Sequence, residues 1–98
     1  MRVGYMRIEL LIHGSRSLKE KRRPLKSLIE RLANRFNISV AEVGHHDLHQ
    51  RAAIGVALVA ADGGNLFDRM RAVKDFVCNN PDCQVLDVKE CQVGENRE

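Results

Sequence analysis

Apolar residues in this chain switch between two spacings, and the order of those spacings limits the fold more than any other feature. From residue 4 to 12 they fall on every second position, which is typical of a strand with one buried face. Over 25–36 and 66–77 they recur every three or four positions, as on one side of a helix. The other apolar segments are short and of strand type: 38–43, 52–61 and 85–93. The predicted order is strand, helix, strand, strand, helix, strand.

That order predicts an α+β fold of ferredoxin-like βαββαβ topology, with two helices on one face of a four-stranded antiparallel sheet. Right-handed crossovers then place the first and third strands in the centre. The 98 residues suffice for one core, so we expect a single domain over 1–98 with a loose tail at about 94–98. In the third strand, the small residues Ala53, Gly55 and Ala57 are expected to let a helix approach closely.

Two local irregularities are predicted. Ser-Leu-Lys-Glu at 17–20 matches the capping box that begins many helices. Pro24 conflicts with a smooth continuation, because proline lacks the N–H and clashes with the preceding turn. We expect either a kink near Arg23 or a separate first turn with the main helix starting at Pro24. In the last strand the alternation slips at 89–90, as it does at a bulge in an edge strand.

Composition narrows the compartment and the chemistry. No apolar run approaches the roughly 20 residues that span a bilayer. Residues 1–12 mix three charged side chains into their apolar residues, whereas a signal peptide keeps its apolar stretch free of charge. A cytoplasmic location without membrane attachment is therefore expected. Cys78, Cys83 and Cys91 are odd in number and form no C-x-x-C pair, which predicts free thiols. We expect no cofactor.

One end of the predicted fold concentrates basic and histidine side chains. The first two strands run in the same direction, so the loops that follow them, near 13–17 and 45–51, share an end and hold all four histidines. Eight of the 16 lysines and arginines lie between Arg16 and Arg35. Cations in the first turns of a helix oppose its dipole, so this run is either an anion site, with helix amides and basic side chains facing phosphates, or a solvated face that keeps the protein soluble. The candidate binding residues are Arg16, Ser17, Lys19, Lys21, Arg22, His45, Asp47, Gln50 and Arg51.

Other chemistries at this end are weaker hypotheses. The histidines supply a ligand type that zinc accepts, at a spacing that matches no metal motif: His13, His45, His46 and His49. In a catalytic hypothesis, Ser15 or Ser17 is the nucleophile, His45 the base and Asp47 the residue that orients His45. Neither serine, however, lies in a G-x-S-x-G or comparable motif. Arg16 on a glycine-containing loop could cradle a phosphoryl group as in the acylphosphatases, which share this layout, although their motif is absent.

Three segments resemble the YlxP-like family of small bacterial proteins: SLKEKR at 17–22, RFNISVAE at 35–42 and H-x-D-x-x-Q-R-A-x-I-G at 45–55. The resemblance covers nearly the whole chain and implies a ferredoxin-like fold without a known activity. In some bacteria members are encoded beside translation-initiation and ribosome-maturation factors, which implies a role near the ribosome. Pro24, His46 and His49 depart from the family pattern. The shared positions are Ser17, Leu18, Lys19, Lys21, Arg22, Glu42, His45, Asp47, Gln50 and Arg51.

Three functional hypotheses follow. The first is a non-catalytic module that binds RNA or a ribosomal particle through this end, using phosphate and shape contacts because the aromatic base-stacking motif of RNA-recognition domains is absent. The second is binding of a small phosphorylated metabolite, or a phosphate-handling reaction, at the same end. The third is a homodimer formed through the open face of the sheet, where Tyr5 and Leu11 would be exposed apolar positions.

Overall fold

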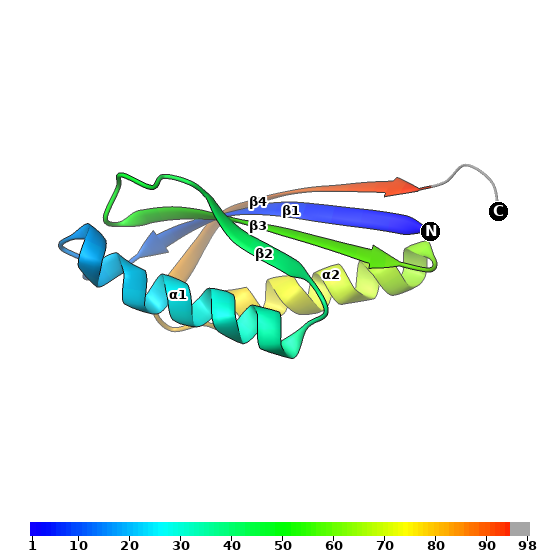
Figure 1. Cartoon of the computed structure of the whole chain (residues 1–98), viewed down its shortest axis with the longest axis horizontal. Coiled ribbons are helices and arrows are strands. Elements are labelled where there is room, and N and C mark those ends of the chain that lie inside the picture. The colour runs from blue at the N-terminus through cyan, green and yellow to red at the C-terminus, as the bar shows by residue number, and fades with distance from the viewer. Residues whose placement is uncertain (95–98) are drawn as a thin grey trace.

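The structure is a computed structural model that describes residues 1–94, and its elements follow the predicted order. They are β1 (Arg2–Ile12), α1 (Leu18–Arg35), β2 (Ser39–Gly44), β3 (Arg51–Ala60), α2 (Gly63–Cys78) and β4 (Cys83–Gly94) (Figure 1). The strands form one antiparallel sheet in the order β2-β3-β1-β4, with β1 and β3 central. The predicted ferredoxin-like fold is therefore confirmed. Gly94 ends β4, and the rest of the tail predicted at 94–98 lies outside the described residues.

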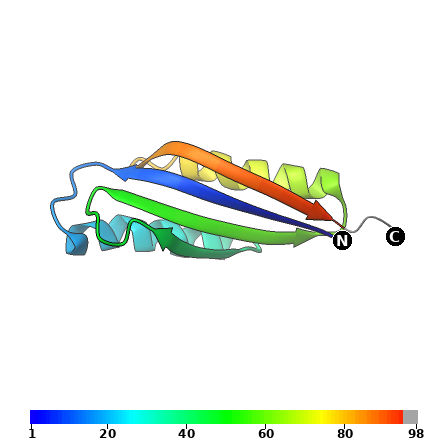
Figure 2. The ribbon, with the colours of Figure 1, turned by 90° about the horizontal axis from the view of Figure 1, so that it is seen from above.

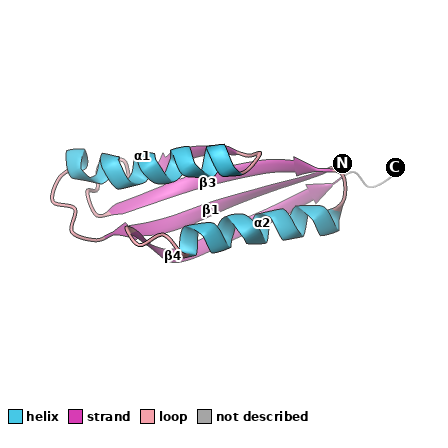
Figure 3. Cartoon of the chain, turned by 90° about the horizontal axis from the view of Figure 1, so that it is seen from below, coloured by secondary structure: helices cyan, strands magenta, loops and turns pink. Residues whose placement is uncertain are grey.

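The core lies between one face of the sheet and both helices (Figure 3). The even positions of β1 face it, and Ile8 and Leu10 are fully buried. Gly4 belongs to the same row, where a Cβ atom would lie 2.5 Å from Sδ of Met70 in α2. Glycine at this position therefore lets α2 approach the strand closely. The helices contribute one stripe each: Leu25, Leu28 and Leu32 from α1, and Leu66, Met70, Val73 and Val77 from α2.

The other face of the sheet carries no helix (Figure 2). The prediction that the small residues of β3 let a helix approach is wrong, because these residues lie on the face of the sheet that carries no helix. Ala53, Gly55 and Ala57 pair with Glu9, Arg7 and Tyr5 of β1 on the uncovered face, while the even positions of β3 face the helices. We call this face, with its odd-numbered residues of β1 and β3, the open sheet face.

Helix α1 is one element, so the expectation of a separate first turn before Pro24 is wrong. The helix is continuous from Leu18 to Arg35, with Pro24 inside it. Proline removes only one helical hydrogen bond, and the turn that precedes it is held independently at both ends. Ser17 caps it, and the side chain of Lys21 attaches it to the second loop and to β2.

The bulge in β4 lies earlier than the sequence predicts. The register with β1 shifts between Glu9 and Leu10, which pair with Asp87 and Val85, so Leu86 is the extra residue and not 89–90. β4 is an edge strand, as expected. The slip at 89–90 has another cause: Glu90 faces α2 and pairs with Lys74 at 2.8 Å, which puts a charge on the covered side. Within residues 1–94, no helix has both the length and the apolar character needed to cross a membrane.

Candidate functional site

The loops that follow β1 and β2 meet at one end of the sheet, on the left in Figure 1. The amide of Ile12 donates to the carbonyl of Gln50 at 2.8 Å, and Nε2 of Gln50 donates to the carbonyl of Ser15 at 3.3 Å. Ser15 is 4% exposed, and its hydroxyl donates to the carbonyl of Ser17. The juxtaposition predicted from topology is therefore present, and Gln50 contributes to it by joining the two loops.

The start of α1 is capped as the sequence predicts. Oγ of Ser17 accepts from the amide of Glu20 at 3.1 Å. The carboxylate of Glu20 reaches back and accepts from the amide of Arg16, one residue before the usual partner in a capping box. One helix-terminal N–H group, that of Glu20, and the amide of Arg16 just before the cap are thus satisfied, and the direction of the first turn is fixed.

Lys21 is buried, unlike the other candidate cations. It is 3% exposed, and its Nζ donates to Oε2 of Glu42 at 3.3 Å, to the carbonyl of His45 at 3.0 Å and to the carbonyl of Arg51 at 3.3 Å. An ammonium group has three N–H donors, so all of them are used. Lys21 therefore ties α1 to β2, the second loop and the start of β3.

Glu9 is the hub of a second cluster, on the open sheet face. Its Oε1 accepts from Nε of Arg7 at 2.9 Å, and its Oε2 accepts from Nε2 of His45 at 2.8 Å. A carboxylate only accepts, so His45 carries its proton on Nε2. A guanidinium nitrogen of Arg51 lies 3.7 Å from the same Oε2. The hydrogen bond from Arg7, followed by that from His45, holds the pKa of Glu9 below its ordinary value against the opposing effect of burial.

His45 occupies a backbone conformation that few residues other than glycine adopt. Its φ is +60°, in the left-handed region, where histidine is more common than bulky residues. The carbonyl accepts from Nζ of Lys21 and from the amide of Leu48, while the ring contacts Glu9. These contacts hold the residue in place, so the second loop has a fixed start next to both charge clusters.

The remaining candidates are exposed. Arg16, Lys19, Arg22 and Asp47 lie at the surface, and within the described residues their side chains have no recorded hydrogen bond or ion pair. Arg23, the next residue of α1, is in the same state. The structure thus divides the predicted binding residues. Ser17, Lys21, His45, Gln50 and Arg51 hold the end together, and the exposed cations stand in front of it.

The histidines do not converge. His13 hydrogen-bonds Oε1 of Gln84 at 2.8 Å, and His46 lies 3.3 Å from a carboxylate oxygen of Glu42, on the helix side of the sheet. Over residues 1–94, no three His, Cys, Asp or Glu side chains are arranged to hold a metal ion. His45 contacts Glu9 and not Asp47, so a serine–histidine–aspartate set is not assembled either.

Sequence reasoning missed Glu9, which contacts three side chains at this end: Arg7, His45 and Arg51. Its signal was present: Arg7 and Glu9 are charged residues on alternate positions of a strand whose other face is apolar. A central strand carries such charges only where partners on the neighbouring strands neutralise them. Those partners, His45 and Arg51, are distant in sequence, and the register of β1 with β3 brings them into reach.

Comparison with known proteins supports the family resemblance. Residues 3–90 match the family described as "Protein of unknown function (DUF503)". The chain is also 33% identical over 82 residues to an uncharacterized protein of Bacillus subtilis (strain 168), YlxP, and the match spans 84% of this chain and 89% of that protein. The predicted resemblance to YlxP-like proteins is confirmed.

Among solved structures, a crystal structure of a variant of SnoaB, a cofactor-independent oxygenase from Streptomyces nogalater, aligns with 99% of this chain and 95% of its own. The sequences are 8% identical and the TM-score is 0.45, too low to support an inference.

Proposed function

Because the chain belongs to the DUF503 family of proteins of unknown function, we propose its role from its own residues: it is a non-catalytic module that binds RNA, free or in a ribosomal particle, through the exposed cations at the start of α1. We call Arg16, Lys19, Arg22 and Arg23 the basic end. The observation that carries the proposal is that these four side chains are exposed and make no hydrogen bond or ion pair within residues 1–94.

The position of the basic end argues against a role in stability. The N-terminus of a helix carries partial positive charge, so each exposed cation there costs about 0.3–1 kcal/mol. Glu20 is the acidic residue of the first turn, and its carboxylate is engaged by the amide of Arg16. A surface that needed charge only for solubility would gain more from these cations at the other end of the helix.

The arrangement suits a chain of phosphates better than a single phosphate group. The first two turns of a helix extend over about 11 Å, and the cations are distributed along that length on an exposed surface. Lys21, in the same turns of α1, donates to three protein oxygens of β2, the second loop and β3, so the part of the helix that carries these cations is anchored to the sheet. Phosphate contacts of this kind bind without reading bases, so we expect little sequence preference.

The test is binding of a single-stranded RNA at several salt concentrations, together with co-sedimentation with ribosomal subunits at low salt. Each contact between a cation and a phosphate contributes about 0.7 to the slope of log K against log salt for a single strand. The variants Lys19→Ala and Arg22→Ala should each lower that slope by about this amount and weaken binding. Arg71→Ala is the matched control, because Arg71 is exposed on α2 and outside the basic end.

Two results would contradict the proposal. One is the absence of RNA binding and of ribosomal co-sedimentation at low salt. The other is an equal loss of affinity in Arg71→Ala and Arg22→Ala, which would mean that overall charge alone drives the association.

A second candidate function, homodimerisation through the open sheet face, is favoured by a separate observation. Four large apolar side chains lie on this face with about half of their surface exposed: Tyr5 at 52%, Val43 at 44%, Val59 at 55% and Val93 at 56%. Leu11, also predicted to be exposed, is half-buried.

The charges on the open sheet face of one copy can complement those on the same face of a second copy. Arg7 pairs across strands with Lys89, and in the next row Glu9 pairs with Asp87. A two-fold axis between two facing sheets, parallel to these rows and midway between them, would set the basic row of one copy against the acidic row of the other. Light scattering at micromolar concentration tests this, because a dimer should give twice the mass of the chain and Tyr5→Arg should restore a monomer. A monomeric wild-type protein would rule it out.

A further inference from the structure

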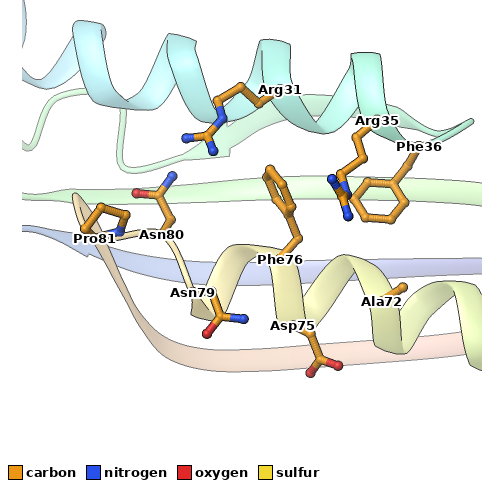
Figure 4. Close-up of a pocket in the computed structure, with 9 residues that line it drawn as sticks. All are labelled: Arg31, Arg35, Phe36, Ala72, Asp75, Phe76, Asn79, Asn80 and Pro81. Atoms are coloured by element: carbon orange, nitrogen blue, oxygen red, sulfur yellow. The ribbon is translucent and has the colours of Figure 1, made fainter.

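A groove between the two helices carries two arginines that the basic end does not include. It has a volume of about 380 Å³ and lies between the C-terminal half of α1 and the C-terminal end of α2 (Figure 4). Its walls include Arg31 and Arg35 from α1, Phe76 from α2, and Asn80 in the connection to β4. We call it the helix groove.

Aromatic rings hold both guanidinium groups in place. Cζ of Arg31 lies 5.4 Å from the centroid of Phe76, and Cζ of Arg35 lies 5.4 Å from the same ring and 5.9 Å from that of Phe36. The two rings pack edge to face with centroids 5.7 Å apart. The rings therefore orient the cations, at about 0.5–1 kcal/mol for each exposed contact, and their covered faces are less available to stack on a ligand.

The guanidinium donors have no acceptor among the described residues of the protein. Within residues 1–94, neither Arg31 nor Arg35 has a recorded hydrogen bond or ion pair, whereas Arg7, Arg51 and Arg69 each direct a nitrogen at a protein oxygen. The nearest carboxylate on the groove wall is that of Asp75, and Figure 4 shows it pointing away from α1.

Asn80 adds a further donor. Its Oδ1 accepts from the amide of Asp82 at 2.8 Å, which leaves its NH2 group for the groove. Figure 4 shows this side chain extending toward that of Arg31. Cations held by rings, with free donors and an amide opposite, form a site for an anion with several acceptor oxygens.

We propose that the helix groove binds the phosphate group of a small phosphorylated molecule, with Arg31 and Arg35 as the phosphate ligands and Asn80 as an additional donor. The volume suits a molecule larger than free phosphate, since ligand pockets begin at about 300 Å³. The inference is independent of the RNA-binding proposal, because it rests on other residues and another part of α1.

The experiment is an NMR titration of the whole chain with inorganic phosphate, pyrophosphate and adenosine monophosphate, at constant ionic strength maintained with chloride. We expect saturable shifts of the Nε–Hε signals of Arg31 and Arg35 and of the backbone amide of Asn80. The double variant Arg31→Gln/Arg35→Gln should bind at least tenfold more weakly. Arg71→Gln, which removes one charge from the outer surface of α2, should bind normally, as should Lys19→Ala from the basic end.

A second variant covers the case in which the double variant fails to fold. Arg35→Lys keeps the charge and loses the planar fork, so it should weaken phosphate binding several-fold if the guanidinium is a ligand. Linear shifts without saturation would overturn the proposal, as would equal weakening by Arg71→Gln. Shifts caused by a single-stranded RNA decamer and by none of the small phosphates would also overturn it, since the groove would then belong to an RNA surface.

Discussion

Replacing Lys21 by methionine tests the proposed division between structural and binding residues. Methionine keeps the length of the buried stem and removes the ammonium group, so the change isolates three hydrogen bonds to Glu42, His45 and Arg51. Removing one partner of a buried ion pair costs about 3–5 kcal/mol when the other charge is left alone.

The actual cost should lie below that range. Glu42 is a quarter exposed and retains His46 at 3.3 Å, so its charge is not stranded. The carbonyl of His45 retains the amide of Leu48 at 3.1 Å. Three bonds at about 1 kcal/mol each then set the loss at about 2–3 kcal/mol, which for a chain of this size lowers Tm by about 8–24 °C.

Urea unfolding followed by circular dichroism measures this loss directly. Lys26→Met is the matched control, because Lys26 is 77% exposed with Glu30 at 4.0 Å, and it should change stability by less than about 0.5 kcal/mol. Folded Lys21→Met should bind RNA like the wild type at a temperature where both are native. If Lys21→Met is as stable as the wild type but loses RNA binding, Lys21 is a contact residue and our assignment of it as an anchor is refuted.

Three further changes follow from individual contacts. The pKa of Glu9 is lowered in the folded protein, so its ionised carboxylate contributes to stability above the ordinary pKa of 4.5 and loses that contribution as pH falls through the folded pKa. The difference in stability between the wild type and Glu9→Gln should therefore close when the pH falls below the folded pKa. Gly14 has a φ of +75° and open space where a Cβ would lie, so Gly14→Ala should cost about 1–2 kcal/mol in urea unfolding from backbone strain alone, and Gly14→Asn less. Burial and the neighbouring Asp82 carboxylate raise the pKa of the Cys83 thiol to about 11. Iodoacetamide at pH 8 should therefore modify the exposed Cys78 and spare Cys83 until urea is added, and peptide mass mapping measures the modification of each.

The topology could be predicted because each segment carries its own period and the connections leave few alternatives. Residues 4–12 show strand alternation without help from the rest of the chain, and the buried side chains at Met6 and Ile8 follow it. The shared end for the loops after β1 and β2 then follows from chain direction. Details that depend on partners distant in sequence did not follow, and the bulge at Leu86 is one, since it is defined by pairing with β1.

The state of Lys21 was the least predictable feature of the site. In the sequence it is one of eight cations between 16 and 35, and its immediate neighbours do not distinguish it from Lys19. Its position in the helix does, because Lys21 precedes Leu25, Leu28 and Leu32 by four, seven and eleven residues and so shares their buried stripe. A cation in an apolar stripe requires acceptors that offset its loss of water, and the partly buried carboxylate of Glu42 in β2 supplies one.

The basic residues of α1 therefore form distinct groups, and this division is the strongest argument that they do more than keep the protein soluble. Lys21 is buried and paired with Glu42, and Lys26 pairs with the carboxylate of Glu30 one turn away. Arg31 and Arg35 are oriented by aromatic rings on the side that faces α2. The surface that begins at Lys19, one turn before Arg23, lies on the far side of the helix from that groove. Within residues 1–94, one helix thus presents two sets of cations without protein acceptors on different sides, which is the arrangement expected if each set binds an anion of its own.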